Sequence, residues 1–351
     1  MPKNWPEKIT DFMTPSPNQT IAVALYSGGL DSTLACRLVA ERNIRVVAIK
    51  FVTPFFGYDL LENPAHHIRA VKEKYAIDLM LVDITAEYLQ MLRAPAHGFG
   101  KNFNPCIDCK ILLLSKAKEM MAVLKASFLI TGEVVGQRPM SQRKDTLRII
   151  ERDSGCENIL VRPLCAKRLP PTKPERTRLI DREQLLDFSG RTRTPQMQLA
   201  ARFNIEDYPS PAGGCVLTDP ILAKRIRWYY RQHDTIVADD IRLLLVGRQF
   251  RLPFGGWLVL GRREEENNQI SALYRPDDCL LELLDRPGPT GLLRYATDRQ
   301  DLELAAGLVV RYGKAGNTRT DAAAVVCKCP TDNTLITVPP LADHLFQTWR
   351  Q

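Results

Sequence analysis

The sequence predicts an α/β protein: a doubly wound parallel sheet followed by a smaller α+β domain. Through about residue 165, short β-branched segments alternate with segments of helical apolar spacing, which is typical of a parallel sheet covered by helices. Beyond about residue 210, two helices, a hairpin and several short strands are expected instead. The length of 351 residues also fits two domains.

The first predicted elements form a βαβ unit. A continuous apolar run over 21–25 predicts a buried strand, and a glycine turn separates it from a helix over 32–41. A second β-branched run over 46–52 predicts the next strand. Strand, helix and strand in this order imply parallel pairing.

The alternation continues along the chain. A helix is expected over 64–75, a strand over 79–82, a long helix over 107–125 and a strand over 128–130. The segment 166–200 is basic and contains prolines, and a helix is expected at 182–186.

The predicted domains are an N-terminal arm, an α/β domain and an α+β accessory domain, over 1–19, 20–220 and 221–351. The arm contains four prolines, and the turn-rich segment 208–214 marks the second boundary. Beyond it we expect two helices within 220–246, a hairpin over 249–262 and short strands up to Pro340.

Composition excludes several classes of protein. Hydrophobic content of 45% and charged content of 25% are average for folded globular chains. No run of about 18 apolar residues exists, so no membrane-spanning helix and no membrane partner are predicted. The first eight residues lack the apolar region of a secretory signal, so a cytoplasmic location is expected.

The positive charge is concentrated in one segment. Residues 138–202 contain fifteen Lys and Arg against eight Asp and Glu, a net charge of 15 − 8 = +7. The whole chain carries +8, so the other 286 residues carry 8 − 7 = +1. Such a segment indicates either a binding site for a polyanion such as nucleic acid or a solvated basic surface.

A glycine loop follows the first predicted strand. Ser27, Gly28, Gly29, Asp31 and Ser32 lie between that strand and the start of a helix. The glycines allow a tight turn and a close approach of the backbone to a ligand, and the helix N-terminus attracts anions. Asp31 fits either a helix cap in an ordinary turn or a position near Mg²⁺.

This loop resembles the Ser-Gly-Gly-x-Asp-Ser loop of the PP-loop ATP pyrophosphatases. The resemblance implies an adenine nucleotide alpha-hydrolase-like fold that binds ATP and Mg²⁺ and adenylates a carbonyl oxygen. It also implies that the adenine lies against the end of the second strand, near Phe51.

Three cysteines are candidates for thiol chemistry. Cys106 and Cys109 form a C-x-x-C at the start of the long helix, where the helix dipole lowers thiol pKa values. With Asn104 and Pro105 they resemble the Asn-Pro-Cys-x-x-Cys segment of tRNA 2-thiouridylases, and Cys215 is placed like the second catalytic cysteine of that family. The set suits a [4Fe–4S] cluster, a persulfide pair or a zinc site, and these alternatives stay open.

The other cysteines are given structural roles. Cys36 and Cys279 are expected in cores, and Cys156 and Cys165 flank a predicted strand and are weaker candidates for a third ligand. The pair Cys327 and Cys329 is expected on one face of a strand.

A second motif follows the strand at 128–130. Gly132, Glu133, Gln137, Ser141 and Gln142 belong to a segment that resembles the Thr-Gly-Glu … Gly-Gln … Ser-Gln segment of tRNA 4-thiouridine synthetases. The resemblance implies a loop over the nucleotide site, in which Gly132 and Glu133 serve the cofactor; the alternative is a plain βα turn. Predicted RNA contacts begin in the same loop: Gln137, Arg138, Ser141, Gln142, Arg143, Lys144, Lys167 and Arg168.

The accessory domain contains a Gly-Arg-x-Glu-Glu-Glu-Asn run at 261–267. This run is similar to the core of the NFACT-type RNA-binding domain, although a generic α+β module is the alternative. RNA contacts would come from a local basic face, for which the candidates are Arg262, Arg263, Arg311 and Lys314. No segment resembles the THUMP module of standard 4-thiouridine synthetases.

Together these features predict an ATP-dependent tRNA sulfurtransferase with Asp31, Cys106, Cys109 and Cys215 as catalytic residues. The Thr-Gly-Glu segment favours a 4-thio product and the Asn-Pro-Cys segment a 2-thio product. A sulfur donor, either sulfide or a cysteine desulfurase, is implied as partner, and a homodimer stays open. The alternatives are a PP-loop ligase of small molecules and a non-catalytic RNA-binding factor.

Overall fold

The computed structural model divides into two compact units, one ending at Thr218 and the other beginning at Asp219. The predicted N-terminal arm lies outside the described residues apart from its last position, 19. The described residues are 19–210, 214–296, 298–314, 321–330 and 333–351.

The first unit is built on a parallel sheet of five strands in the order β3-β2-β1-β4-β5. Every pairing in it is parallel. The predicted doubly wound sheet is confirmed. Its strands are β1 (Ile21–Leu25), β2 (Arg45–Val52), β3 (Asp78–Asp83), β4 (Phe128–Thr131) and β5 (Leu160–Val161).

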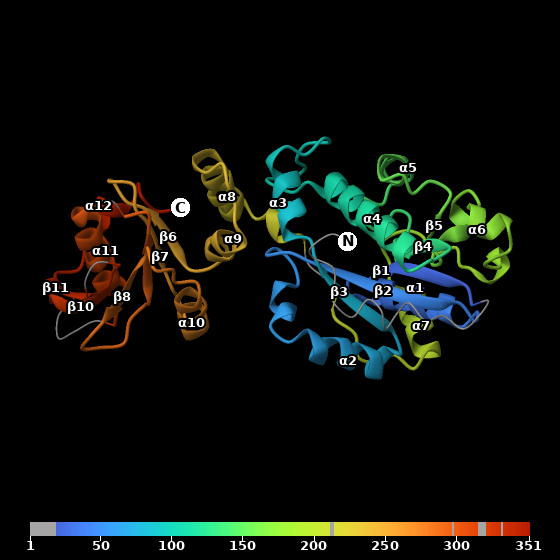
Figure 1. Cartoon of the computed structure of the whole chain (residues 1–351), viewed down its shortest axis with the longest axis horizontal. Helices are drawn as coiled ribbons and strands as arrows, with labels where there is room; N and C mark the ends of the chain where they lie inside the picture. Colours follow the sequence, from blue (N-terminus) through green and yellow to red (C-terminus); the bar gives the residue numbers. More distant parts are fainter. Residues whose placement is uncertain (1–18, 211–213, 297, 315–320, 331–332) are drawn as a thin grey trace. The chain divides into compact units, whose positions relative to one another are not determined.

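Helices cover both faces of this sheet (Figure 1). In β1, Ala22 and Ala24 join the core formed with α1, α2 and α7, while the alternate residues point to the opposite face, where α4 packs. The helices of the first face are α1 (Leu30–Ala40), α2 (Pro64–Tyr75) and α7 (Thr194–Arg202). Those of the second are α3 (Thr85–Arg93), α4 (Cys106–Val123) and α5 (Lys144–Asp153), and a short α6 (Lys173–Arg176) follows β5.

The strand order places a switch point beside β1. The chain proceeds from β1 to β2 and β3 on one side, and later to β4 and β5 on the other. In open parallel sheets the loops at the carboxyl ends of the strands separate at such a point and leave a crevice for ligands. The loops after β1 and β4, which carry the two predicted motifs, meet there.

The second unit contains a six-stranded sheet in the order β11-β10-β8-β9-β7-β6, and its pairings are antiparallel. Its strands are β6 (Arg248–Arg251), β7 (Trp257–Leu260), β8 (Cys279–Leu283), β9 (Gly291–Arg294), β10 (Ala323–Lys328) and β11 (Asn333–Val338). Its helices are α8 (Pro220–Gln232), α9 (Ala238–Leu245), α10 (Glu264–Ala272), α11 (Arg299–Tyr312) and α12 (Asp343–Phe346). The predicted α+β character and the β6–β7 hairpin are confirmed.

Two local expectations were wrong. The helix expected at 182–186 is a single 3₁₀ turn over Arg182–Gln184, and the helix of this region is α7. The long helix α11 lies where only strands and turns were expected. Its buried residues Leu308, Val309 and Val310 include a β-branched pair, and packing against the sheet outweighs that local preference.

A disulfide joins Cys279 and Cys329 in the second unit. The antiparallel register pairs Lys328 with Leu280, so the next opposite pair is residues 279 and 329, whose Cα atoms are 4.2 Å apart. Cys327 is buried on β10, but Cys329 lies just beyond the strand rather than on it. The strand role expected for Cys329 was therefore wrong.

A buried polar network ties α9 to the sheet of the second unit. Arg294, 2% exposed, donates to both carboxylate oxygens of Asp278 at 2.9 and 2.7 Å and also bonds Asp240. The hydroxyl of Tyr229 bonds the second oxygen of Asp240. Within the described residues, no helix has both the length and the apolar character needed to cross a bilayer.

Candidate active site

A cavity of about 1130 Å³ opens at the switch point of the first unit. The glycine loop after β1, the end of β2, helix α2 and four later segments line it. The first three of those later segments lie around residues 101–106, 137–141 and 191–193, and the fourth includes 209–210 and 214–218, so residues far apart in the sequence share one space.

The glycine loop has the conformation of an anion site. Gly28 has a φ of +86°, which favours glycine, and Gly29 begins α1 without a side-chain cap. The hydroxyl of Ser32 donates to the carbonyl of Gly29 at 2.8 Å and lies 3.2 Å from the hydroxyl of Ser27. The first N–H groups of the helix therefore face the cavity without intrahelical partners.

Asp31 faces the cavity rather than capping the helix. Its Oδ2 accepts a hydrogen bond of 2.8 Å from the amide of Gln137, which ties the loop after β4 to the glycine loop. Its Oδ1 is buried and has no hydrogen-bond partner, and the same holds for Oγ of Ser141. Buried polar atoms without partners are rare, so these atoms point to a ligand site. A carboxylate oxygen beside a phosphate site fits Mg²⁺.

Lys50, which the sequence reasoning missed, is the residue of β2 that lines the cavity. Its Nζ donates to the carbonyl of Ser27 at 3.0 Å, and burial lowers the pKa of its ammonium. Phe51, predicted to contact the adenine, is 6% exposed and does not line the cavity. Successive residues of a strand point to opposite faces, so only one of these neighbours can face the nucleotide.

Gly132 brings β4 against the glycine loop. A Cβ at this position would lie 2.5 Å from the backbone of Asp31 and Ser32. No side chain fits there, so the close approach of the two loops requires glycine at this position, and the cofactor role of Gly132 stays a prediction.

Glu133 lies in a buried ion-pair network instead of the cavity lining. It is 3% exposed, 3.0 Å from Arg162 and 3.4 Å from Lys110. Burial alone would raise the pKa of this carboxyl, but the two cations outweigh it and lower the pKa. The structure thus gives Glu133 the role of anchoring the segment after β4, unlike the direct cofactor contact predicted for it.

The three predicted thiols lie in one neighbourhood but not in equivalent positions. Cys106 and Cys215 line the cavity, whereas Cys109, half-buried like them, does not line it and is hydrogen-bonded to Tyr88. Burial raises the pKa of Cys109 to about 11, and burial also raises the pKa of Cys215. The pair that lines the cavity is therefore Cys106 and Cys215.

Hydrogen bonds fasten the Cys215 segment to the loop before α4. The amide of Asn102 donates to the carbonyl of Thr218 at 2.6 Å, and the N–H of Phe103 donates to that of Leu217 at 3.1 Å. The hydroxyl of Thr218 closes the turn on the carbonyl of Cys215 at 2.6 Å. Three residues of the predicted glycine-rich segment before this cysteine, 211–213, lie outside the described residues.

The thiols do not form a site for a single metal ion. In the part of the chain that the structure describes, no group of three or more His, Cys, Asp or Glu side chains is arranged to hold a metal ion. Each thiolate of a [4Fe–4S] cluster binds a different iron, so the set predicted for a cluster, Cys106, Cys109 and Cys215, does not require the arrangement of a single-ion site. The cluster stays a prediction.

The predicted RNA-binding residues divide into two groups. Gln137, Arg138 and Ser141 line the cavity, and Gln142 braces their loop by accepting from the N–H of Arg138 at 3.1 Å. The others lie on the surface outside the lining, and three of them pair with acids: Arg143 with Asp145, Lys167 with Glu183 and Arg168 with Asp187, while Lys144 is exposed.

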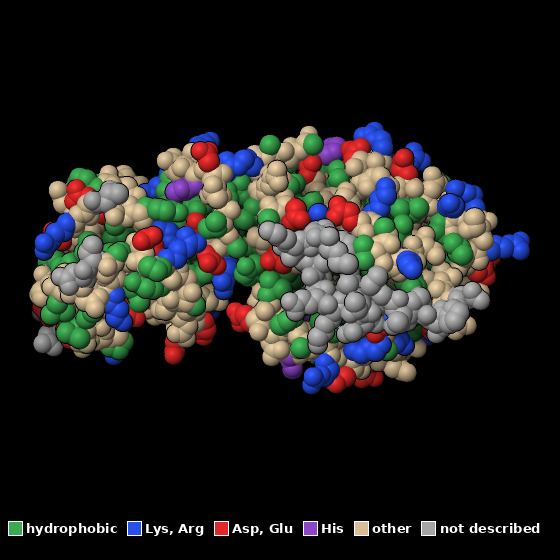
Figure 2. Space-filling view, viewed as in Figure 1, with side chains coloured by type: hydrophobic (Ala, Val, Ile, Leu, Met, Phe, Trp, Pro, Cys, Tyr) green, Lys and Arg blue, Asp and Glu red, His purple; other side chains and the backbone are tan. Residues whose placement is uncertain are grey.

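The cavity lining is nevertheless strongly basic. Among the described residues that line it, Asp31 is the only acidic one. Its cations are Lys50, Lys74, Lys101, Arg138, Arg191 and Arg193. Three of these belong to the +7 segment, which could have directed attention to Arg191 and Arg193. On the face that Figure 2 shows, Lys and Arg side chains elsewhere are scattered among Asp and Glu.

Two segments of the chain match known families. Residues 18–168 match the family described as "Thiamine biosynthesis protein (ThiI)", and residues 247–350 match "NFACT protein RNA binding domain". Both matches confirm the resemblances inferred from the sequence. The segment 169–246, which includes Cys215, α8 and α9, falls between them.

Curated relatives match about half of the chain. A "Probable tRNA sulfurtransferase" of Thermococcus kodakarensis is 23% identical over 181 residues, which are 51% of this chain and 42% of the relative. A protein of the same description from Ureaplasma parvum is 25% identical over 182 residues, with the same coverage. The alignment spans less than half the length of these relatives.

Solved structures show further likenesses. A 4-thiouridine synthetase–RNA complex with bound ATP has a TM-score of 0.39 and 20% identity, and the match covers 64% of this chain and 52% of that one. The U34-tRNA thiolase NcsA from Methanococcus maripaludis, with its [4Fe-4S] cluster, has a TM-score of 0.31 and 16% identity, with coverages of 65% and 72%.

Proposed function

We propose that this protein is an ATP-dependent tRNA sulfurtransferase that replaces a carbonyl oxygen of a uridine with sulfur. The observation that carries the proposal is that one cavity is lined by both the glycine loop and the two thiols Cys106 and Cys215. A nucleotide-activating site and a sulfur-carrying site thus face the same space. The family match of residues 18–168 and the description of the curated relatives support the same activity.

The first half-reaction uses the glycine loop. The N–H groups at the start of α1 and the ammonium of Lys50 would hold the phosphates of ATP, and Asp31 Oδ1 would hold Mg²⁺. When bound, Mg²⁺ supplies charge neutralisation of the phosphates. A carbonyl oxygen of the base attacks the α-phosphorus, pyrophosphate leaves, and the oxygen becomes part of an AMP leaving group.

The second half-reaction uses the thiols. In the persulfide form, the persulfide of a cysteine desulfurase first transfers its outer sulfur to one thiol, because sulfide cannot form a persulfide on a thiol without an oxidant. That terminal sulfur attacks the carbon that bears AMP, and AMP departs. The second thiol then attacks the inner sulfur, which leaves the outer sulfur on the base and creates a Cys106–Cys215 disulfide. The two thiols supply the two electrons that reduce the persulfide sulfur, and an external thiol reductant restores them.

The basic lining suits tRNA as the substrate. Arg138, Arg191, Arg193 and Lys101 can contact several phosphates of a polyanion around the base that enters the cavity. A small metabolite would not require so many cations. We infer that the sulfur donor is sulfide or a cysteine desulfurase, and a 4-thio product is slightly favoured over a 2-thio product.

Nucleoside analysis tests the proposal. The purified protein is incubated with unmodified tRNA, ATP, Mg²⁺ and a thiol reductant, and either with sulfide or with cysteine and a desulfurase. Digested tRNA is compared with 2-thiouridine and 4-thiouridine standards by mass spectrometry. We expect one thionucleoside and an equal amount of AMP.

Cysteine variants sharpen this test. Cys106→Ser and Cys215→Ser should lower product formation by the persulfide route at least about a hundredfold, as expected when a covalent step is removed. Cys327→Ala, a buried cysteine of the other unit, is the control and should keep wild-type activity. No thionucleoside with either donor, from protein that binds ATP and tRNA, would refute the proposed activity.

A further inference from the structure

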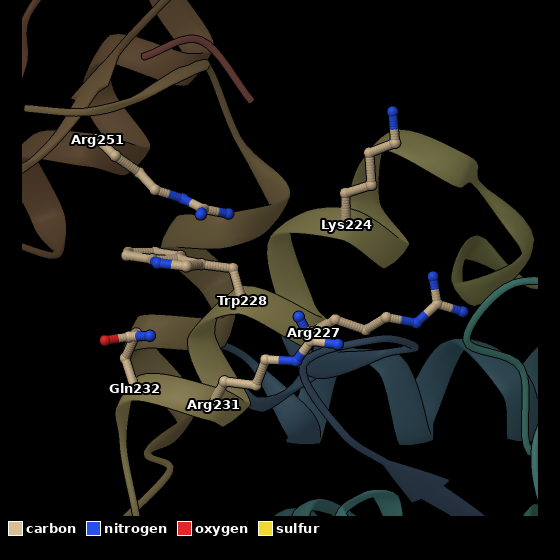
Figure 3. A pocket seen from close by; sticks show the side chains of 6 residues that line it. All are labelled: Lys224, Arg227, Trp228, Arg231, Gln232 and Arg251. Carbon is tan, nitrogen blue, oxygen red and sulfur yellow. The ribbon is translucent and has the colours of Figure 1, made fainter. Parts of the chain in front are cut away.

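A second cavity, of about 380 Å³, lies in the second unit between α8 and β6. The described residues that line it include four cations and a tryptophan, and none of them is acidic (Figure 3). Its lining residues are Lys224, Arg227, Trp228, Arg231, Gln232 and Arg251. Five of the six precede residue 247, where the match to the RNA-binding family begins.

In helix α8, the residues that pack against the rest of the unit lie on a different side from those that line this cavity. Leu222, Ile226 and Tyr229 are buried against the unit. Arg225 also turns inward, because its guanidinium donates to the carbonyls of Leu244 at 3.1 Å and Gly247 at 3.3 Å. One arginine of the helix therefore serves the fold, whereas Lys224 and Arg231 lie exposed on the opposite face.

The cations of the opposite face form a stripe. Lys224, Arg227 and Arg231 are spaced by three and four residues, so they follow one side of the helix. Among the described residues, neither Lys224 nor Arg231 has an ion-pair partner, and both are exposed. Like charges at this spacing repel one another, which favours an anion placed between them.

Trp228 and Arg251 add a planar surface beside the stripe. The guanidinium of Arg251 lies over the indole of Trp228, 4.4 Å from the ring centroid, and donates to Gln351 at 2.8 Å. Trp228 itself packs edge-on against the buried Trp257 at 5.8 Å. Figure 3 shows Arg251 and Trp228 stacked at one end of the pocket, with Gln232 near them, and Lys224 and Arg227 at the other end. A guanidinium fixed in this way offers a flat face for a base and N–H groups for a phosphate.

We propose that this pocket is an RNA-binding site, in which the stripe of α8 contacts consecutive phosphates and the Arg251–Trp228 stack contacts an unstacked base. The inference rests on the proposed function in that tRNA is the expected RNA. It also places the RNA-binding surface of this unit at α8 and β6, instead of at the basic residues named from the sequence. Arg311, one of the candidates named from the sequence, pairs with both oxygens of Asp343 at 2.8 Å, and Arg262 donates to the carbonyl of Gly247 at 2.8 Å.

Salt-dependent RNA binding by the full chain tests the site. Binding of a fluorescein-labelled tRNA transcript and of an unstructured 12-nucleotide RNA is measured by anisotropy between about 50 and 200 mM salt. For Lys224→Ala/Arg231→Ala, the slope of log affinity against log salt should fall by about 0.7–0.9 for each cation removed. For Arg251→Lys, which keeps the charge but loses the planar stack, affinity should fall about fivefold with little change of slope.

The matched control removes two exposed cations elsewhere in the unit, in Arg299→Ala/Lys328→Ala, and should bind RNA like the wild type. An equal loss in this control, or unchanged binding in both α8 and β6 variants, would overturn the inference. Polyglutamate that binds as tightly as the 12-nucleotide RNA would also overturn it, because the pocket would then accept any polyanion.

The result of the RNA-binding test can be distinguished from the result of the thiolation test. A Cys106→Ala/Cys215→Ala protein should lose sulfur transfer and keep RNA binding at α8. If the wild type makes no thionucleoside but the α8 variants lose RNA affinity, the activity fails and the site stands. If thiolation proceeds and the α8 variants bind RNA normally, the site fails alone.

Discussion

At Gly132, the absence of one methyl group decides how closely two loops approach. The position lies directly after β4, and its backbone meets that of Asp31 and Ser32 at the start of α1. The neighbouring atoms are backbone atoms, which cannot move aside like the end of a flexible side chain. The resemblance to a Thr-Gly-Glu motif therefore has a physical explanation in this chain.

Gly132→Ala should displace the glycine loop and weaken ATP binding. A Cβ 2.5 Å from backbone atoms forces a shift of the kind that costs about 1–3 kcal/mol in packed sites, equivalent to about five- to 150-fold in affinity. Calorimetric titration with ATP and Mg²⁺ measures the change. Gly307→Ala, where the added Cβ meets only ordinary contacts of 3.5 Å or more, is the control. Unchanged affinity in Gly132→Ala would show that the two loops do not depend on each other.

The thiols allow a second residue-level prediction. Cys109 does not line the cavity, and burial raises the pKa of its thiol to about 11, so little of it is the reactive thiolate at pH 8. In Cys109→Ser the hydroxyl can still bond Tyr88. Sulfur transfer by the Cys106–Cys215 pair should therefore persist within about tenfold.

The variant Cys109→Ser also distinguishes a mechanism that uses the thiol pair Cys106 and Cys215 from one that uses a [4Fe–4S] cluster. In anaerobically purified protein, iron content and activity are measured together for Cys109→Ser and the wild type. Iron in the wild type that disappears along with all activity in Cys109→Ser would contradict the pair and support the [4Fe–4S] prediction. Raising the pH should increase alkylation of Cys109, because its thiolate forms only as the pH approaches 11.

The motifs of this site could be predicted from the sequence. The direction in which single side chains point could not. Lys50 and Phe51 are neighbours on β2, and only the register of the sheet determines which of them faces the cavity. The signal was present, since Lys50 is the only charged residue inside an apolar strand. Glu133 shows the opposite case: its cations Lys110 and Arg162 are 23 and 29 residues away, beyond what a local motif reveals.

At the scale of elements, α9 is anchored by a buried carboxylate. Asp240 is 2% exposed and bonds Arg294, Arg275 and two tyrosine hydroxyls, whereas its neighbour Asp239 is half-exposed. Removing one partner of a buried ion pair leaves the other uncompensated. Residues 219–246 therefore belong to the second unit, although the family match begins after them.

Asp240→Asn should destabilise the second unit by about 3–5 kcal/mol, the cost typical of breaking a buried pair. Asp239→Asn is the adjacent control, and its loss should stay within about 1 kcal/mol because its ion pairs are exposed. Urea denaturation followed by tryptophan fluorescence measures both, since Trp228 and Trp257 lie near the network. Equal stability of the two variants would mean that the network does not support α9.

The elements themselves were predictable to different degrees. The strands and helices of the first unit follow from apolar runs and helical spacing, because each element of a βαβ fold is defined by its local pattern. The second unit depends more on pairing between distant segments. Helix α11 packs on four strands, and the Cys279–Cys329 bond depends on the register of β8 and β10. Neither can be read from neighbouring residues alone.

At the scale of the whole molecule, the net charge of a segment does not show where a polyanion can bind. The +7 segment contributes Arg138, Arg191 and Arg193 to the cavity, while Lys167 and Arg168 pair with acids of the same segment. The second unit is nearly balanced in charge, yet α8 carries four cations and no acid. Ion pairing between side chains, and not composition, determines which cations can bind a polyanion.

The two units should also unfold as separate transitions. Each has its own sheet and its own core, and the division falls between consecutive residues, Thr218 and Asp219. A ligand stabilises only the unit that binds it, so ATP with Mg²⁺ at about 100 times its dissociation constant should stabilise the first unit by about 2.7 kcal/mol. Cys329→Ser should instead lower only the second transition, because opening a loop between residues 50 apart adds entropy worth about 4 kcal/mol to the unfolded chain.

Differential scanning calorimetry of the full chain distinguishes these expectations. The wild type should show two transitions, of which ATP with Mg²⁺ raises one and Cys329→Ser lowers the other. Cys36→Ala, which alters a buried cysteine of the first unit, is the control and should leave the second transition unchanged. A single transition that shifts as a whole with either change would contradict the independence of the two cores. The glycine-loop site and the α8 pocket would then have to be treated as parts of one cooperative structure.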